Sequence, residues 1–437
     1  MDEKFVLGEG RLEELKEIAH FALLIGTYKS KKEKKSCEEH LQEVERLSET
    51  YGIINTEKLP IPLREISAST YLGKGKVKEI ADLCKEKNID LIIFDDDISP
   101  QQQRNLEKVF EKPVIDRTEL ILGVFEQRAK TKEAKIQIDL ARFHYQLPRL
   151  KRMWTHLSRQ RVGGKSKGYL KGAGERQIEI DRRLLKDKIS KLEKELIHIR
   201  KQRQIQRSSR LRSNIPTFAI VGYTNAGKST LLNALTEANV LVEDKLFATL
   251  DTTTRKFILP NKQEILLIDT VGFIRKIPLT LIAAFKSTLE ETLFTDILIH
   301  LIDISSPNAQ EQAENSMDVL KELQAEKKPI ITVLNKIDAA QDMKMAYKLK
   351  IKYKKTVFIS ALKKEGFDDL LEMMMKEISR LRKIVCLKIP QSHYEIVARI
   401  MKEAKVISCE YEENDIIIKA EISQNLEKLV SQFLIDG

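Results

Sequence analysis

The chain is poor in the residues that build disulfides, metal centres and membrane spans. Four cysteines (Cys37, Cys84, Cys386 and Cys409) lie far apart without a C-x-x-C pair, and the seven histidines show no metal-ligand spacing. We therefore expect buried free thiols in a reducing compartment and no zinc site. No run of about 18 apolar residues occurs, and the opening MDEKFVLGEG lacks the features of a signal peptide. These absences favour a cytoplasmic protein without a membrane span, at most associated peripherally with a membrane.

The 437 residues are 42% hydrophobic and 32% charged, which is typical of a globular protein of about two to four domains. The net charge is +11, but its distribution is uneven. Residues 128–212 contain 26 Lys and Arg against 8 Asp and Glu, whereas the rest of the chain contains 50 against 57. Such a basic segment favours contact with a polyanion such as RNA. The alternative is a solvated coiled coil, although mixed charges would serve solubility better.

The first part of the chain alternates short apolar runs with amphipathic ones. FALLIGT (21–27), DLIIFDDD (90–97) and PVIDR (113–117) are typical of strands, and helical patterns lie between them. This alternation predicts βαβ units that form a small parallel sheet. We expect an N-terminal α/β domain over residues 1–130, and we find no phosphate-binding loop in its sequence.

From about residue 131, helical heptads replace the strands. One seam comprises Ile136, Leu140, Phe143, Leu147, Leu150, Trp154 and Leu157, and a second comprises Ile178, Arg182, Leu185, Ile189, Leu192, Leu196 and Ile199. The glycine- and lysine-rich segment 161–176 between them is expected to break the helix. The pattern predicts a basic antiparallel hairpin over residues 131–213, with arms of roughly 25–30 residues, about 40 Å long. Pro148 should kink the first arm.

Residues 217–230, TFAIVGYTNAGKST, combine an apolar strand, a glycine-rich turn and the start of a helix. This is the P-loop pattern in the context that it requires. Its expected nucleotide contacts are Gly222, Tyr223, Thr224, Asn225, Ala226, Gly227, Lys228 and Ser229. Backbone N–H groups would converge on the phosphates, Lys228 would reach the β- and γ-phosphates, and the Ser229 hydroxyl would bind Mg²⁺.

Three further elements follow in the order that a GTPase requires. Asp269, Thr270, Val271 and Gly272 follow an apolar strand, so Asp269 would hold Mg²⁺ through water and the Gly272 N–H would meet the γ-phosphate. Asn335, Lys336, Ile337 and Asp338 match the guanine-reading element, since a carboxylate accepts from two donors that adenine lacks. Ser360, Ala361 and Leu362 resemble the loop that supports the base. We therefore predict GTP binding by a doubly wound P-loop GTPase domain over residues 214–383.

Spacing alone does not identify the magnesium ligand in switch I, because FATLDTTTR (247–255) has four threonines suited to bind Mg²⁺. The FATLD, DTVGF and NKID motifs, the charged hairpin and the stretch ending Gly172-Ala173-Gly174-Glu175 resemble the HflX family of ribosome-associated GTPases over nearly the whole chain. The resemblance implies that Thr249 is the switch I magnesium ligand, and that the nucleotide is lined by Phe247, Ala248, Thr249, Leu250 and Asp251. Lys228, Thr249 and Gly272 are then the catalytic residues. Thr252 and Leu362 stand where the family usually has proline and lysine, and the hairpin loop contains less glycine than usual.

The resemblance also implies a partner and a task. Family members bind the large (50S) ribosomal subunit, place the hairpin loop near the peptidyl-transferase region, and separate stalled ribosomes. We expect contact with 23S rRNA through the hairpin, and a monomer. A GTPase for rRNA or large-subunit maturation, and a nucleotide-gated RNA-binding module with negligible turnover, are the alternatives. Residues 384–437 follow a β-α-β-β-α pattern, which predicts a small α+β domain that either contacts a ribosomal protein or stabilises the GTPase domain.

One residue departs from the usual chemistry of switch GTPases. Phe273 follows the DTVG element where Ras-type proteins carry the glutamine that orients the attacking water, and a phenyl ring cannot do so. We expect slow hydrolysis by the free protein, about 10⁻⁴ to 10⁻² per second. Asn225 is a candidate K⁺ ligand beside the β- and γ-phosphates, or else it only shapes the turn. Docking on the ribosome is the second way in which the attacking water could be placed. The alternative role for Phe273 is packing.

Overall fold

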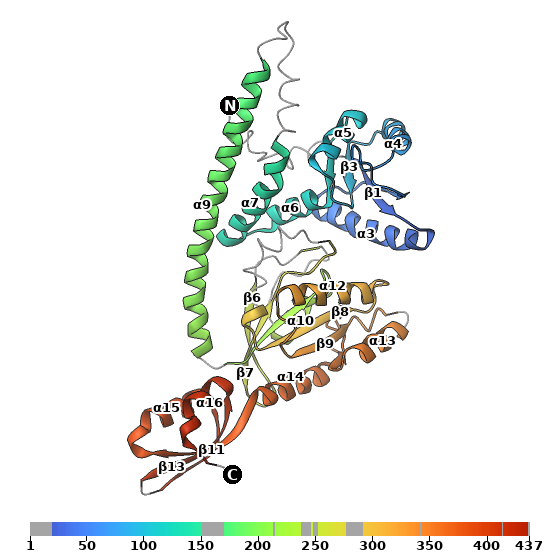
Figure 1. Cartoon of the computed structure of the whole chain (residues 1–437). Helices are drawn as coiled ribbons and strands as arrows, with labels where there is room; N and C mark the ends of the chain where they lie inside the picture. The colour runs from blue at the N-terminus through green and yellow to red at the C-terminus, as the bar shows by residue number, and fades with distance from the viewer. Residues whose placement is uncertain are drawn as a thin grey trace. The chain divides into compact units, whose positions relative to one another are not determined.

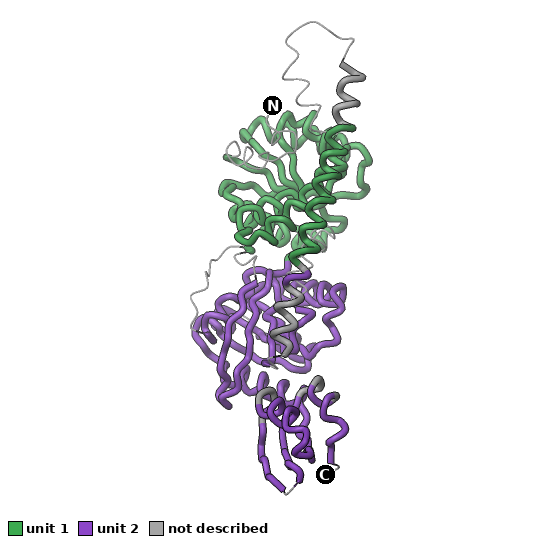
Figure 2. The backbone as a smooth tube through the Cα atoms, turned by 90° about the vertical axis from the view of Figure 1, so that its left-hand side faces the viewer, with its two compact units in different colours: residues 1–199, 242–251, 274–288 green, residues 200–241, 252–273, 289–437 purple. Residues whose placement is uncertain are grey.

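A computed structural model describes residues 20–150, 170–212, 215–236, 246–247, 252–276, 292–340, 343–412 and 414–435. The chain divides into two compact units (Figure 2). Unit 1 comprises residues 1–199, 242–251 and 274–288, and unit 2 comprises residues 200–241, 252–273 and 289–437. The chain therefore passes from unit 2 into unit 1 directly after Phe273. Within the described ranges, no helix is long and apolar enough to span a membrane.

Unit 1 contains a four-stranded parallel sheet in the order β2-β1-β3-β4. Its strands are β1 (Ala22–Tyr28), β2 (Thr56–Pro62), β3 (Leu91–Phe94) and β4 (Val114–Asp116). Helices α3 (Lys34–Tyr51) and α6 (Arg117–Arg128) pack together on one face, and α4 (Lys74–Glu86) and α5 (Pro100–Phe110) on the other (Figure 1). The predicted sheet is confirmed. Sequence patterns missed β2, whose prolines Pro60 and Pro62 are tolerated because the strand lies at the sheet edge.

The two helical arms are α7 (Lys132–Gln146), continued by the short 3₁₀ helix η2 (Leu147–Arg149), and α9 (Leu170–Arg212). Their seams meet as predicted, in a cluster of Ile136, Leu140, Phe143, Leu147, Leu150, Leu185, Ile189, Leu192, Leu196 and Ile199. The α-helical geometry ends just before Pro148, in agreement with the expected kink. Trp154, Leu157 and residues 161–169 lie outside the described residues.

Two expectations about the second arm were wrong. The helix α9 already runs through residues 170–176, and its 43 residues exceed the expected length. Gly172 and Gly174 are tolerated there because a glycine costs a helix only about 1 kcal/mol relative to alanine. The residues around them, Leu170, Lys171, Glu175 and Arg176, are good helix formers.

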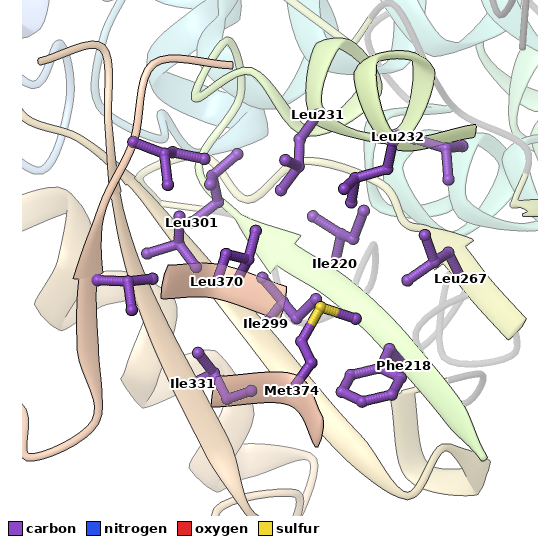
Figure 3. Close-up of a cluster of buried hydrophobic side chains, with 14 of the residues drawn as sticks. Phe218, Ile220, Leu231, Leu232, Leu267, Ile299, Leu301, Ile331, Leu370 and Met374 are labelled. Atoms are coloured by element: carbon purple, nitrogen blue, oxygen red, sulfur yellow. The ribbon is translucent and has the colours of Figure 1, made fainter. Parts of the chain in front are cut away.

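Unit 2 contains a six-stranded sheet in the order β10-β9-β8-β5-β7-β6, parallel except for β6. Its strands are β5 (Thr217–Gly222), β6 (Thr253–Ile258), β7 (Glu264–Asp269), β8 (Ile297–Asp303), β9 (Ile330–Asn335) and β10 (Thr356–Phe358). Its helices are α10 (Lys228–Thr236), α12 (Ala309–Glu322), α13 (Lys344–Lys352) and α14 (Phe367–Leu381). In Figure 3, Ile220 of β5 lies near Leu231 and Leu232 of α10, and Phe218 of the same strand lies near Met374 of α14. The predicted doubly wound GTPase fold is confirmed.

The end of the chain forms a separate antiparallel sheet in the order β12-β13-β11-β14. Its elements are β11 (Arg382–Pro390), α15 (Tyr394–Glu403), β12 (Lys405–Tyr411), β13 (Asp415–Ser423), α16 (Gln424–Val430) and β14 (Leu434–Ile435). The predicted α+β domain is confirmed, but its last strand was missed. Two residues are too few to produce the alternation from which a strand is predicted.

Candidate functional site

The P-loop connects the end of β5 to the start of α10, and two glycines make its path possible. Gly222 has φ 152°, and a Cβ atom there would lie 2.3 Å from the carbonyl oxygen of Leu301. Gly227 has φ 94°, and a Cβ there would lie 2.5 Å from Nδ2 of Asn335. Any larger residue would therefore be strained by its backbone and by a collision. The glycines of the motif are required by this geometry.

Lys228, at the start of α10, is buried inside the P-loop. Its Nζ donates hydrogen bonds to the carbonyl oxygens of Tyr223 at 2.8 Å and Gly222 at 3.3 Å. Burial lowers the pKa of Lys228 to about 8, although the neighbouring Asp269 acts in the opposite direction. An anionic ligand beside this ammonium group would favour its charged form. The side chain is placed to meet phosphate oxygens at the N-terminus of a helix.

Asp269 and Ser229 are in contact with each other at the edge of the P-loop. The Ser229 hydroxyl donates to Oδ2 of Asp269 at 2.7 Å. Hydroxyl and carboxylate oxygens are the ligands that Mg²⁺ prefers, so these two residues fit the expected ion. Thr270, next in the chain, has a structural contact, since its hydroxyl donates to the carbonyl oxygen of Ile220 at 2.7 Å. The motif thereby joins β7 to the neighbouring β5.

Phe273 pairs with the P-loop through its backbone rather than its ring. Its N–H donates to the carbonyl oxygen of Gly222 at 3.0 Å, and its carbonyl accepts from the N–H of Thr224 at 2.7 Å. The ring is 1% exposed. Gly272 lies so close to the loop that an added Cβ would be 2.8 Å from both Nζ of Lys228 and Cα of Thr224. The DTVGF segment thus lies directly against the phosphate-binding turn, with Val271 also buried.

The guanine-reading element is tied to both neighbouring loops by one amide. Nδ2 of Asn335 donates to the carbonyl oxygen of Ala226 at 2.8 Å, and its Oδ1 accepts from the N–H of Ala361 at 2.9 Å. The P-loop, the NKID element and the 360–362 loop are therefore held together by a single buried side chain. Sequence reasoning placed these motifs in one site but did not foresee this connection.

Lys336 and Asp338 carry the polar groups of the NKID element. Nζ of Lys336 pairs with Oδ2 of Asp303 at 2.7 Å. A hydrogen bond from the Ser360 side chain lowers the pKa of Asp338, which keeps this carboxylate ionised. Ile337 lies between them, and its N–H donates to the carbonyl of Ile359 at 3.3 Å. An ionised carboxylate can accept from two donors at once, as recognition of guanine requires.

Leu362 and Phe247, two residues expected to contact the nucleotide, have different surroundings in the structure. Leu362 is 77% exposed, so its side chain makes little contact within the protein. Phe247 belongs to unit 1, where its ring packs edge to face on that of Phe125 at 4.4 Å between centroids. The other expected switch I residues, Ala248, Thr249, Leu250 and Asp251, lie outside the described residues.

Sequence reasoning missed a charged cluster in unit 1 that includes the residues after DTVGF. Oδ1 of Asp95 accepts from Arg117 at 2.8 Å, and its Oδ2 accepts from Arg275 at 2.6 Å. Lys276 pairs with Asp95 at 3.3 Å and also with Asp96. Nε of Arg117 donates to the carbonyl oxygen of Arg275 at 3.2 Å. The signal was the acidic run after β3, because ligands in parallel sheets gather at the carboxyl ends of strands.

Three models of protein families match the chain. They are the N-terminal region of GTP-binding GTPases over residues 38–126, their middle region over residues 128–210, and the 50S ribosome-binding GTPase over residues 217–336. A protein from Chlamydia pneumoniae described as GTPase HflX is 46% identical over 414 residues, which cover 94% of this chain and 88% of the relative. The chain belongs to the HflX family of GTPases. The resemblance noted in the sequence is thereby confirmed.

A second relative supports the same family. The GTPase HflX of Escherichia coli (strain K12) is 42% identical over 342 residues, covering 78% of this chain and 79% of that protein. A crystal structure of a GTP-binding protein from Sulfolobus solfataricus in complex with GDP is 27% identical, covers 83% of this chain and 99% of that one, and has a TM-score of 0.43. As an HflX-family GTPase the chain binds GTP and is expected to hydrolyse it.

Proposed function

We propose that this GTPase acts on the large (50S) ribosomal subunit, through 23S rRNA, to separate or rescue stalled 70S ribosomes. GTP would contact residues 222–229, 269–272, 335–338 and 360–362, and switch I would supply the other contacts. The observation that carries the nucleotide part is the Asn335 side chain, which links the phosphate-binding turn to the base loop. Mg²⁺ would be held by Ser229 and Thr249, and by Asp269 through water.

The ribosomal part of the proposal rests on charge and on family membership. Residues 128–212 carry the basic excess of the chain, and the GTPase region matches the family model described as a 50S ribosome-binding GTPase. A basic arm that neutralises phosphates loses affinity with salt, with a slope of about −0.7 to −0.9 per contact. A cytoplasmic monomer that binds rRNA through this arm is the form we propose.

We further propose that hydrolysis waits for the partner. The buried ring of Phe273 cannot hold water, so the free protein would keep its GTP until a ribosome orders the switches. The test is GTP hydrolysis by the free protein, then with 50S subunits, with 30S subunits as the control. A rise of about 10-fold or more with 50S alone is expected, because the order of the switches limits catalysis. An unchanged rate would refute the proposal that hydrolysis waits for the ribosome. If Phe273→Gln does not change the rate of the free protein, packing remains as the role of Phe273.

Splitting is tested separately by sedimentation of intact 70S particles after incubation with the protein and GTP. Release of 50S and 30S particles is expected, and immature large subunits serve as the competing substrate. If only the immature subunits respond, the maturation role replaces splitting. Tight binding without any turnover would instead favour the nucleotide-gated binding module.

A K⁺ ion beside the phosphates is the second proposed aid to hydrolysis, with Asn225 as its ligand. Asn225 has φ 61°, a left-handed conformation that asparagine adopts more readily than most residues. Shaping of the turn is therefore the competing role. Glycine would preserve this conformation without the side chain, so Asn225→Gly separates the two. We expect faster hydrolysis in K⁺ than in Na⁺ for the wild type and equal rates for the variant; retained K⁺ stimulation in the variant would reject this role.

A further inference from the structure

Thr224, in the middle of the P-loop, has a hydroxyl group to which no described residue forms a hydrogen bond. The residue is 6% exposed, and within the described residues its Oγ1 has no hydrogen-bond partner. Its backbone N–H is occupied, since it donates to the carbonyl oxygen of Phe273 at 2.7 Å. Burying a hydroxyl without a partner is unfavourable, so such a group needs an explanation beyond stability.

The side chain of Thr224 lies beside Gly272 and Lys228, the two residues expected to meet the γ-phosphate. An added Cβ on Gly272 would be 2.8 Å from Cγ2 of Thr224 and 2.8 Å from Nζ of Lys228. In P-loop GTPases this lysine reaches the β- and γ-phosphates, and the DTVG glycine faces the γ-phosphate. Rotation about the Cα–Cβ bond of Thr224 exchanges Cγ2 and Oγ1 between staggered positions. The hydroxyl can thus point at the place where a methyl group now faces Gly272.

Three neighbouring side chains, those of Thr270, Ser229 and Phe273, are either already hydrogen-bonded or apolar. The hydroxyl of Thr270 donates to the carbonyl oxygen of Ile220, and that of Ser229 donates to Asp269. The ring of Phe273 is buried and has no polar atom. A hydroxyl both donates and accepts, so one group can hold a water molecule and a phosphate oxygen together.

We propose that Thr224 is a catalytic residue for GTP hydrolysis, whose hydroxyl holds the attacking water beside the γ-phosphoryl group in place of the missing glutamine. The proposal rests on the GTPase activity of the family. The water oxygen forms a bond to the γ-phosphorus, the bond from that phosphorus to the β–γ bridging oxygen breaks, and GDP leaves with the electron pair. Both water protons end on the released phosphate, so Thr224 orients the water and takes no proton.

The test compares Thr224→Val, which keeps the shape and removes the hydroxyl, with Thr224→Ser, which keeps the hydroxyl. Single-turnover hydrolysis by the full chain gives the rate, and fluorescent GTP and GDP analogues give the affinity. We expect Thr224→Val to lose at least about 10-fold in rate, with affinities within about 2-fold, and Thr224→Ser to stay within about 3-fold of the wild type.

Thermal stability distinguishes a catalytic role of Thr224 from a structural one, because loss of a structural hydroxyl would lower the melting temperature. Because the hydroxyl has no hydrogen-bond partner in the part of the chain that the structure describes, Thr224→Val should melt at the same temperature as the wild type or higher. Thr356→Val is the control, since its hydroxyl donates to the carbonyl oxygen of Tyr353 at 2.6 Å, away from the P-loop; its hydrolysis rate should not change. A wild-type rate in Thr224→Val, or a loss that accompanies weaker folding, overturns the proposal. A wild type that binds GTP without turnover would overturn the GTPase assignment as well.

Discussion

Replacing Asp95 with asparagine should destabilise unit 1, because two buried guanidinium groups share this carboxylate. Arg117 donates to one oxygen at 2.8 Å and Arg275 to the other at 2.6 Å, and all three side chains are less than a tenth exposed. Asparagine has nearly the same shape but no negative charge. The change would leave both guanidinium groups facing a neutral amide, although Arg117 keeps its ion pair with Glu43, and removing one charge from a buried ionic cluster is costly.

Two estimates give the size of the effect. Burial by itself would raise the pKa of Asp95, but Arg117, Arg275 and Lys276 together outweigh it and lower the pKa to about 2 from 3.8. At about 1.4 kcal/mol per pKa unit, this corresponds to roughly 2.5 kcal/mol. Loss of one partner from a buried pair typically costs about 3–5 kcal/mol. We therefore expect a loss of about 3 kcal/mol, or roughly 6–12 °C in Tm for a unit of this size.

The sign of the pH dependence follows from the lowered pKa. The stabilisation is complete above the unfolded-state value of 3.8 and is lost as the pH falls through about 2. Calorimetry of the full chain at neutral pH measures the shift. Asp318→Asn is the matched control, because the exposed pair of Lys321 and Asp318 at 2.9 Å should contribute little to stability. A shift below about 2 °C for Asp95→Asn would refute the reasoning.

Three further outcomes are expected. Burial raises the pKa of Asp116 to about 7, so its contribution to stability falls as the pH rises from about 4 to 7. When melting temperatures are measured across this pH range, Asp116→Asn should remove this decrease. Asp303→Asn removes the ion pair that holds the side chain of Lys336, so it should weaken GTP and GDP binding about 3- to 10-fold in a titration and change kcat less. An affinity equal to that of the wild type would contradict a positioning role for Asp303. Gly222→Ala forces a Cβ against a carbonyl oxygen and should abolish either nucleotide binding or folding, the latter measured by circular dichroism. Gly73→Ala is the control and should be neutral, because a Cβ there would meet nothing within 4 Å.

The motifs of the candidate nucleotide site and the two helical seams could be predicted from the sequence alone. The P-loop, DTVG and NKID motifs are short segments in which backbone and side chains must satisfy local geometry, so their chemistry can be recognised residue by residue. The seams were predictable for a related reason, since residues such as Leu185 and Ile189 recur at the helical period. The doubly wound sheet followed from these motifs, and the small N-terminal sheet followed from the alternation of apolar strands and helices.

Contacts between distant parts of the chain were decided only by the tertiary structure. Asp95 and Arg275 are 180 residues apart and belong to no periodic pattern, so nothing local indicates their ion pair. The same applies to the amide of Asn335, which joins loops 109 and 26 residues away. The buried hydroxyl of Thr224 became informative only when its surroundings showed no partner. Residue types and spacing identify which groups are available, but burial and long-range packing determine which of them are satisfied and which remain for a ligand.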